Sequence, residues 1–487
     1  MPNVEAPSKA KSSNSHPRTN PLTRHNMKQN IITATLVAAT LAVAATSCGI
    51  YKKYQTPDNT PLTAEYVQAR QNNVDSTALG NLLWEEVFTD PVLADLIDRA
   101  LASSSTLANA RLNIDIARAQ LRGAKLAYLP SVSLAPNGSG SSIAGSSISW
   151  GYQIPAVVSW EVDLFGKLLN SKRGAAVAVE QSEAYAQAVR SQLIATVANT
   201  YYSMAAVEAQ LKVARNTAKI WSESVQVMRD LKEAGKSGMT EAAVVQANAN
   251  LQSVLAQITE LENTRLNLDN AMSLLVETMP THWEVSADAT LDIPAPILQG
   301  VPMSYLAMRP DVTAAERSLA AAYYNTASAR AAFYPNLSIS FTGGFTNQLG
   351  TMIKNPGEWF YNLAGSLTAP LFARGQNIAR LQAAKAQQTQ ALNSFEHTLL
   401  SAASEVSNAM SAYTTAGQRA AIFEAQSADL EKAVEYTNDL MIYANGTYLE
   451  VLTAQQSLLA AQLNQVSCRL ARNQAIINLY QSLGGGR

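Results

Sequence analysis

The chain has 487 residues, with 36 Lys and Arg against 37 Asp and Glu, so its net charge is −1. This balance excludes a broad basic surface for nucleic acid. Charged residues make up only 15% of the chain, where soluble proteins carry about 25%, which favours extensive helix–helix or membrane contact. Two cysteines and four histidines exclude a disulfide framework and argue strongly against a zinc site built from His and Cys clusters.

The first fifty residues are expected to direct the protein to its compartment. Residues 1–26 are polar, and we interpret them as an extension that precedes the true start at Met27. Residues 27–47 begin with a positive charge and continue as an uncharged run from Ile31 to Ala45. Such a run is too short for a stable spanning helix and is typical of a secretory signal.

Small residues stand directly before Cys48, and this ending resembles a bacterial lipoprotein signal. The resemblance implies that Cys48 becomes the first mature residue and carries a covalent lipid that includes palmitate, which anchors the chain to a membrane. Ala45 departs from the Leu that the family usually has there. By resemblance to the enterobacterial sorting rule for such lipoproteins, Gly49 after the cysteine, in place of Asp, favours the outer membrane. An ordinary signal peptide with a nearby thiol is the alternative.

The remainder of the chain contains one unit twice. The segment AYLPSVSL at 127–134 recurs as AFYPNLSI at 332–339, and looser matches follow at offsets of 205 to 207 residues. Each copy is predicted to run helix, strand, strand, long helix, helix. The predicted parts are an extended tail (48–83), the first copy (84–290), the second copy (291–483) and a C-terminal tail (484–487).

Two amphipathic strands are predicted in each copy, within about 130–164 and about 335–371. From Trp150 to Leu164 every second residue is apolar, with one apolar exception on the polar side. An apolar face flanked by Trp and Tyr, with a polar opposite face, suits a strand between lipid and a water-filled lumen. A sheet packed on a soluble core shows the same alternation and remains the alternative.

A long helix is predicted after the strands of each copy. Residues 175–234 contain neither Pro nor Gly, and their apolar residues recur mostly at alternating spacings of three and four. This spacing is typical of a coiled-coil seam. A helix of about 60 residues extends about 90 Å. A long exposed helical stalk is the alternative.

Four strands per chain cannot close around a pore, because barrels begin at about eight strands. An open sheet edge in lipid leaves unpaired backbone groups that each cost several kcal/mol. If the strands lie in a membrane, copies of the chain must therefore join to close the sheet. Two chains give eight strands and three give twelve, and the periodicity does not choose between them.

Three stretches resemble TolC-like outer-membrane factors. They are SWEVDLFGK at 159–167, MRPDV at 308–312 with ARAAFYP at 329–335, and YLEVLTAQQ at 448–456. The middle stretch resembles the lipoprotein (NodT-like) branch that serves resistance–nodulation–division pumps. The resemblance implies an α+β membrane protein with an internal two-fold repeat. It implies a homotrimer whose twelve-stranded β-barrel, four strands per chain, continues into a long α-helical coiled-coil barrel.

The resemblance also implies a function without chemistry. The chain is expected to be the outer-membrane channel of a tripartite efflux pump, working with a periplasmic adaptor and an inner-membrane transporter. A type I secretion exit duct is one alternative, and a surface-anchored structural coiled-coil lipoprotein without a pore is another. We find no catalytic motif in the sequence and expect no cofactor other than the lipid on Cys48.

In this family the periplasmic aperture is lined by Asp, Arg and Tyr near the tip of the helical hairpins. The matching residues are Tyr436 and Asp439 in the second copy, with Arg229 and Asp230 near the equivalent tip of the first. A ring of three carboxylates would select cations or hold the aperture shut. Charges on a solvated helix are the alternative for each residue.

Arg309, Pro310 and Asp311 are interpreted as a structural motif at the start of a helix. Proline fits the first helical turn because its missing N–H would be unpaired there in any case. Asp311 beside it suits the positive end of the helix dipole.

Overall fold

The computed structural model describes residues 51–70, 79–143, 145, 147–235, 240–286, 291, 303–347, 357–444 and 447–486. The predicted signal at 27–47 and Cys48 lie outside these residues. The chain divides into two units, Met1–Lys53 and Tyr54–Arg487. The second unit contains all the helices and strands described below.

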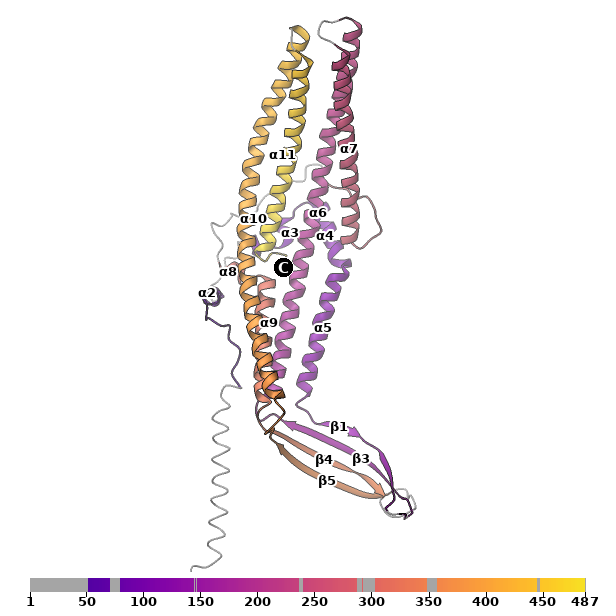
Figure 1. The fold of residues 1–487 in the computed structure, drawn as a ribbon, viewed down its shortest axis with the longest axis vertical. Helices are drawn as coiled ribbons and strands as arrows, with labels where there is room; N and C mark the ends of the chain where they lie inside the picture. The colour runs from indigo at the N-terminus through magenta and orange to yellow at the C-terminus, as the bar shows by residue number, and fades with distance from the viewer. Residues whose placement is uncertain are drawn as a thin grey trace, which may run out of the picture. The chain divides into compact units, whose positions relative to one another are not determined.

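The elements follow the predicted order, with short helices before the first strands (Figure 1). They are α2 (Pro61–Ala69), η2 (Leu79–Asn81), α3 (Trp84–Val87), α4 (Pro91–Ser103), α5 (Ser105–Leu126), β1 (Ser131–Leu134), β2 (Asn137–Ser141), β3 (Ser149–Val162), α6 (Lys167–Glu233), α7 (Glu241–Leu275), α8 (Met303–Leu306), α9 (Pro310–Ala331), β4 (Asn336–Asn347), β5 (Glu358–Thr368), α10 (Gln376–Tyr443) and α11 (Tyr448–Ser482).

The long predicted helix is confirmed as α6, which has 67 residues and extends about 100 Å. Its buried apolar residues keep the predicted spacing of three and four, as in Leu211, Ala214, Ala218, Trp221 and Val225. The helix packs against α5, α7, α9 and α11. The alternative of an exposed stalk is therefore wrong. Helix α6 pairs with α7 in one helical hairpin, and α10 pairs with α11 in a second. Because α11 also packs against α6, the two hairpins lie side by side.

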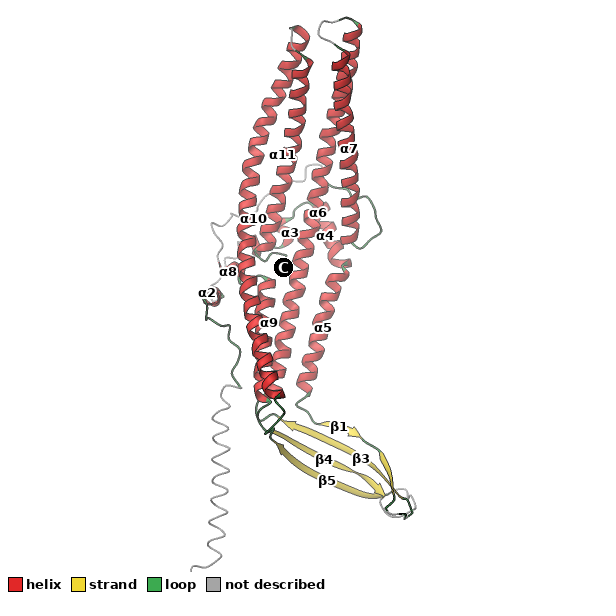
Figure 2. Ribbon diagram, viewed as in Figure 1, coloured by secondary structure: helices red, strands yellow, loops and turns green. Residues whose placement is uncertain are grey.

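The strands form one antiparallel sheet, which Figure 2 shows at the end of the helices away from the hairpin tips. Along the sheet the order is β1, β3, β4, β5, and β2 also pairs with β3. Strands β1 and β2 pair with consecutive parts of β3 and are separated at Ala135 and Pro136. They therefore act as one strand interrupted at a proline, which cannot donate a ladder hydrogen bond.

The segment 48–83 was expected to be extended, and within its described part this expectation is wrong. Helix α2 begins at a capping box made by Thr60 and Thr63, with Pro61 at its first position. Tyr66 is fully buried, and its ring meets Phe395 of α10 edge to face at 5.0 Å. Burial of this aromatic side chain stabilises the segment against the helices.

The residues after α11 pack on α6. The main-chain oxygen of Gly486 accepts hydrogen bonds from Gln187 and Arg190 of α6, at 2.9 and 2.8 Å. The main-chain oxygen of Gly485 accepts one from the Ser191 hydroxyl at 2.5 Å.

Among the described residues, no helix has a stretch long and apolar enough to cross a bilayer.

Candidate functional site

The register of the sheet aligns most apolar residues of β1, β3, β4 and β5 on one face. On β3 and β4, Trp160 pairs with Ile339 and Val158 with Phe341. Apolar pairs continue this face on both sides, with Val132 opposite Val158 and Leu363 opposite Phe341. The other face consists mainly of Ser, Thr and other polar residues, with Val157 and Phe360 as apolar exceptions. The predicted two-faced strands thus join into one two-faced sheet.

No described part of the chain covers the apolar face of this sheet. Side chains of Val132, Leu363 and Tyr361 are 72%, 72% and 74% exposed. A soluble protein rarely exposes so large an apolar area. The alternative of a sheet packed on a soluble core is therefore wrong. Phe345 and Trp359 meet at 5.2 Å near one end of the sheet, and Trp160 lies near the other, as in the aromatic girdles at membrane interfaces.

Both edges of the sheet are open within the chain. Among the described strands, β5 pairs only with β4, and β1 and β2 pair only with β3. Unpaired N–H and C=O groups along both edges can accept a further strand.

The hairpin tips bring all four long helices together. One apolar cluster there contains Met228 of α6, Val244 of α7, Met441 of α10 and Val451 of α11, among others. At the tip of the first hairpin, Lys232 near the end of α6 forms an ion pair with Glu241 at the start of α7. The hydrogen bond from Lys232 and its charge, with the nearby charge of Arg229, lower the pKa of Glu241.

The structure brings two of the four predicted aperture residues together. Tyr436 and Asp439 line a hollow of about 400 Å³ on α10, and both are exposed. Arg229 and Asp230 are also exposed, on α6, where Asp230 accepts a hydrogen bond from Gln226 at 2.9 Å. Within the described chain, no hydrogen bond or ion pair joins this pair to Tyr436 or Asp439. The four residues thus occupy separate hairpins of one protomer.

Arg309 joins three helices at the level where α9 begins. It is the N-cap residue of α9, with Pro310 at the first position. Its guanidinium binds both carboxylate oxygens of Asp311 at 3.0 and 2.7 Å, and it binds Glu405 of α10 at 2.6 Å. It also donates to the main-chain oxygen of Ser482 in α11 at 2.9 Å. The geometry agrees with a structural motif and extends it from one helix start to three helices.

Arg309 is 6% exposed. Burial alone lowers its pKa, but the hydrogen bonds and charges of Asp311 and Glu405 outweigh burial and raise the pKa of Arg309. The Arg309 guanidinium therefore stays positively charged, as its bidentate contact with the Asp311 carboxylate requires.

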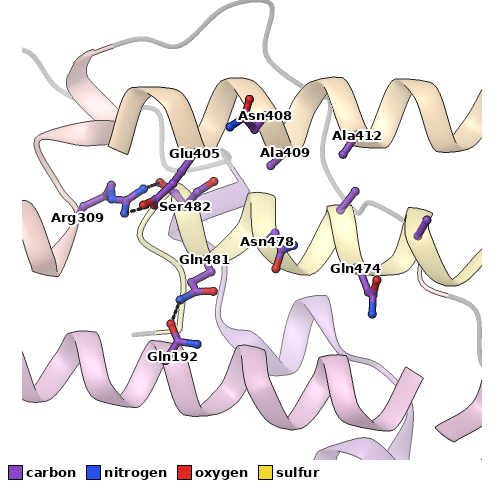
Figure 3. A pocket seen from close by; sticks show the side chains of 12 residues that line it. Gln192, Arg309, Glu405, Asn408, Ala409, Ala412, Gln474, Asn478, Gln481 and Ser482 are labelled. Atoms are coloured by element: carbon purple, nitrogen blue, oxygen red, sulfur yellow. Dashed lines mark hydrogen bonds and ion pairs between the residues drawn. The ribbon is translucent and has the colours of Figure 1, made fainter. Parts of the chain in front are cut away.

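A groove of about 610 Å³ extends from Arg309 along α10 and α11, with Gln192 of α6 at its border (Figure 3). Neutral polar side chains join α11 to α6 along it, and Gln481 donates to Gln192 at 2.6 Å. The other polar residues that line the groove are Glu405, Asn408, Gln474, Asn478 and Ser482. These groups can hydrogen-bond with water or solutes, but they include no nucleophile paired with a base. Among the described residues no cluster of His, Cys, Asp and Glu could hold a metal ion.

Two buried ionic clusters were not predicted from the sequence. Asp269 of α7 binds Arg265, the main-chain N–H of Trp283 at 3.0 Å and the His282 ring at 2.9 Å. This cluster fastens the segment after α7 back onto the helix. The only sequence signal is the spacing of four between Arg265 and Asp269.

The second cluster centres on Glu316 of α9, which is 1% exposed. Its carboxylate accepts a hydrogen bond from Thr56 at 2.8 Å and pairs with Arg70 at 3.3 Å. Both partners belong to the N-terminal segment, so Glu316 fastens that segment to α9. Burial, followed by the charge of Glu316, raises the pKa of Tyr66 to about 12.

Comparison with known proteins places this geometry in a family. The profile of the outer membrane efflux protein family matches residues 96–276 and 301–485. The chain is 29% identical over 476 residues to the probable efflux pump outer membrane protein TtgC of Pseudomonas putida, covering 93% of this chain and 95% of that protein. It is 28% identical over 457 residues to the cation efflux system protein CusC of Escherichia coli, covering 92% and 97%.

A solved structure of the outer-membrane channel OprN has the same fold. It matches with a TM-score of 0.80 at 26% identity and covers 89% of this chain and 98% of OprN.

Proposed function

The chain belongs to the outer membrane efflux protein family and is an outer-membrane channel for efflux, and we propose that three copies of it close one twelve-stranded barrel. Each copy contributes a four-stranded sheet, with β1 and β2 as one interrupted strand. Each also contributes two helical hairpins, which continue the barrel as an α-helical tunnel. The two halves of the chain, which have the same order of helices and strands, represent an internal repeat.

The observation that carries this proposal is the exposed apolar face of the sheet, bounded by two open edges. Lipid would cover the face, and strands of neighbouring copies would pair with the edges. An unpaired backbone group in lipid costs several kcal/mol, so closure is strongly favoured. A structural coiled-coil lipoprotein without a pore gives no account of this face. A lipid on Cys48 would add an anchor before the helical body.

In this proposal the channel passes small molecules outward without chemistry. A periplasmic adaptor and an inner-membrane transporter of the resistance–nodulation–division class deliver them. The partners open the tunnel by favouring one of two packings of the hairpins. Tyr436 and Asp439, which line one hollow on α10, form the aperture with Arg229 and Asp230 of the other hairpin.

Purified protein in a planar bilayer tests the channel. We expect stepwise ion currents, and the absence of any current from correctly assembled protein would contradict the proposal. Deletion of the gene separates efflux from protein secretion. Efflux predicts greater sensitivity to drugs, bile salts or metals, whereas a type I secretion duct predicts the loss of a secreted protein.

The aperture is tested by Asp439→Asn. Three carboxylates around one axis attract cations, so their removal should reduce cation selectivity and change conductance. The matched control is Asp429→Asn, since Asp429 is a second exposed aspartate of the same helix, about 15 Å away. Selectivity and conductance that equal those of the wild type in both variants would remove Asp439 from the aperture.

A further inference from the structure

Two tryptophans mark the two ends of the apolar face on strand β3. Trp150 and Trp160 are ten residues apart and belong to the same face, because side chains alternate along a strand. Ten residues extend about 33 Å along a strand. A strand tilt of about 40° reduces this length to about 25 Å of height, which is the height of the apolar band in membrane barrels. In the proposed barrel, Trp160 therefore lies at the level of the lipid headgroups on the side of the helices.

The Trp160 side chain joins strand β3 to the segment between α5 and β1. Its indole N–H donates to the main-chain oxygen of Tyr128 at 2.9 Å. Trp160 is nevertheless 39% exposed. The hydrogen bond therefore fixes the position of the indole and leaves part of its ring for contact with lipid.

A lysine of α6 approaches the same segment. The Lys172 ammonium lies 5.6 Å from the centroid of the Tyr128 ring, a distance at which an aromatic face attracts a cation. Lys172 is half-buried, as expected of a lysine whose aliphatic part is covered while its charge reaches water. We call Trp160, Tyr128 and Lys172 the aromatic corner. Its three residues come from β3, the α5–β1 segment and α6.

The aromatic corner has positive charge without a carboxylate partner. No acidic side chain of the described chain pairs with Lys172, whereas nearby Lys167 pairs with Glu161 at 2.9 Å. Lys125 is a second exposed cation, in the last turn of α5 and three residues before Tyr128. It also has no acidic partner among the described residues. The corner therefore suits a ligand that combines an anionic group with an apolar part.

The second copy of the repeat has no such corner. The two copies are aligned through the matching segments 127–134 and 332–339, the LF pairs at 164–165 and 371–372, and the left-handed glycines that precede α6 and α10. At the counterparts of Tyr128, Trp160 and Lys172, the second copy has the apolar residues Phe333, Leu367 and Leu381. The same order of helices and strands thus forms without the corner, so packing alone does not account for its residues.

We propose that the aromatic corner binds an anionic phospholipid of the leaflet nearest the helices. Lys172 binds the phosphate, and Trp160 packs against the glycerol and the upper part of an acyl chain. Tyr128 positions both residues, Lys172 through its ring and Trp160 through its main-chain oxygen. Lys125 attracts the same phosphate from the end of α5. This inference rests on the proposed barrel in the outer membrane and adds a lipid site to it.

Titration with dioleoylphosphatidylglycerol tests the site in the full-length protein extracted with detergent. Native mass spectrometry counts the lipids that each particle binds. Lys172→Gln should lower the affinity for this lipid about fivefold, because a lysine near an anionic lipid surface contributes about 1 kcal/mol. Lys172→Arg should retain the affinity of the wild type, because it keeps the charge.

Arg380→Gln is the matched control, because Arg380 is an exposed cation at nearly the same distance from the start of α10. Its affinity for the lipid should equal that of the wild type. An unchanged affinity in Lys172→Gln, or an equal loss in Arg380→Gln, would overturn the site and leave the proposed channel intact. A wild-type protein that gives no current in a planar bilayer would instead overturn the channel, and the lipid site with it.

The two tryptophans distinguish a lipid from free phosphate. Trp160→Leu should lower the affinity for the lipid, whereas Trp150→Leu, at the other end of the same face, should leave it unchanged. Inorganic phosphate at the same concentration should not displace the lipid, because only a lipid contacts the apolar face. Displacement by inorganic phosphate, or equal affinities in the two tryptophan variants, would contradict a lipid site.

Discussion

Asp90 joins three segments of the helical core through hydrogen bonds. It caps α4 by accepting from the main-chain N–H of Val92 at 2.9 Å, and it accepts from the Tyr201 hydroxyl at 2.6 Å. That hydroxyl accepts in turn from the main-chain N–H of Ser286 at 3.0 Å. Burial raises the pKa of Asp90, but the hydrogen bonds from Tyr201, Ser286 and Val92 outweigh it, so the pKa is lowered.

The lowered pKa gives a pH prediction for Asp90→Ala. A carboxyl whose pKa is lower in the folded state stabilises the fold above its unfolded pKa of about 3.9 and loses that effect as pH falls through the folded pKa. We expect the variant to lose about 1 kcal/mol of unfolding free energy at pH 7 through the lost cap. The difference from wild type should shrink as the pH falls below about 4.

Urea unfolding of the full chain in detergent, followed by circular dichroism at pH 7 and pH 3, measures this difference. Asp98→Asn is the control, since Asp98 is an exposed residue of the same helix. A deficit for Asp90→Ala that is equally large at both pH values would show that the ionised carboxylate is not the stabilising group.

Single residues were predictable from sequence where their contacts are local. Pro310 and Asp311 were placed correctly at the start of a helix, since capping depends on adjacent residues. Arg309 binds Glu405 and Ser482, which lie 96 and 173 residues later in the chain. No local pattern indicates such contacts, and the buried carboxylates of Asp269 and Glu316 were missed for the same reason.

The strands and long helices were predicted well because their periods are local. A period of two fixes the faces of β3, and a spacing of three and four fixes the seam of α6. The expected extended tail was wrong because α2 is held by tertiary contact. Tyr66 packs on Phe395, which is 329 residues away, although Thr60 and Pro61 do carry a helix-start signal.

The two faces of the sheet predict opposite responses to charge. Leu363 belongs to the apolar face and pairs with Phe341, whereas the neighbouring Asn362 pairs with Thr342 on the polar face. Arginine on a lipid-facing position near the bilayer centre costs about 2–4 kcal/mol. We therefore expect Leu363→Arg to reduce assembled channel in the outer-membrane fraction at least tenfold and Asn362→Arg to leave it nearly unchanged.

Leu363 and Asn362 are both exposed in the isolated protomer. The fold of the protomer alone therefore predicts that arginine is tolerated equally at the two positions. Quantifying heat-sensitive oligomer in isolated outer membranes distinguishes the two cases. An equal loss in both variants, or no loss in either, would mean that lipid does not cover the apolar face.

The whole assembly depends on closure of the sheet. The described part of one chain provides a sheet with two open edges and an uncovered apolar face. Lipid covers such a face, but open edges cannot persist in a bilayer. Joining of copies along these edges pairs the backbone groups of the edge strands.

The number of chains in the detergent-extracted particle tests this account most directly. Native mass spectrometry of the full-length protein, purified from outer membranes, measures that number without cross-linking. The account predicts particles of three chains, which dissociate only when the detergent becomes denaturing. Particles of one chain would contradict it, because a single four-stranded sheet would then persist with both edges unpaired.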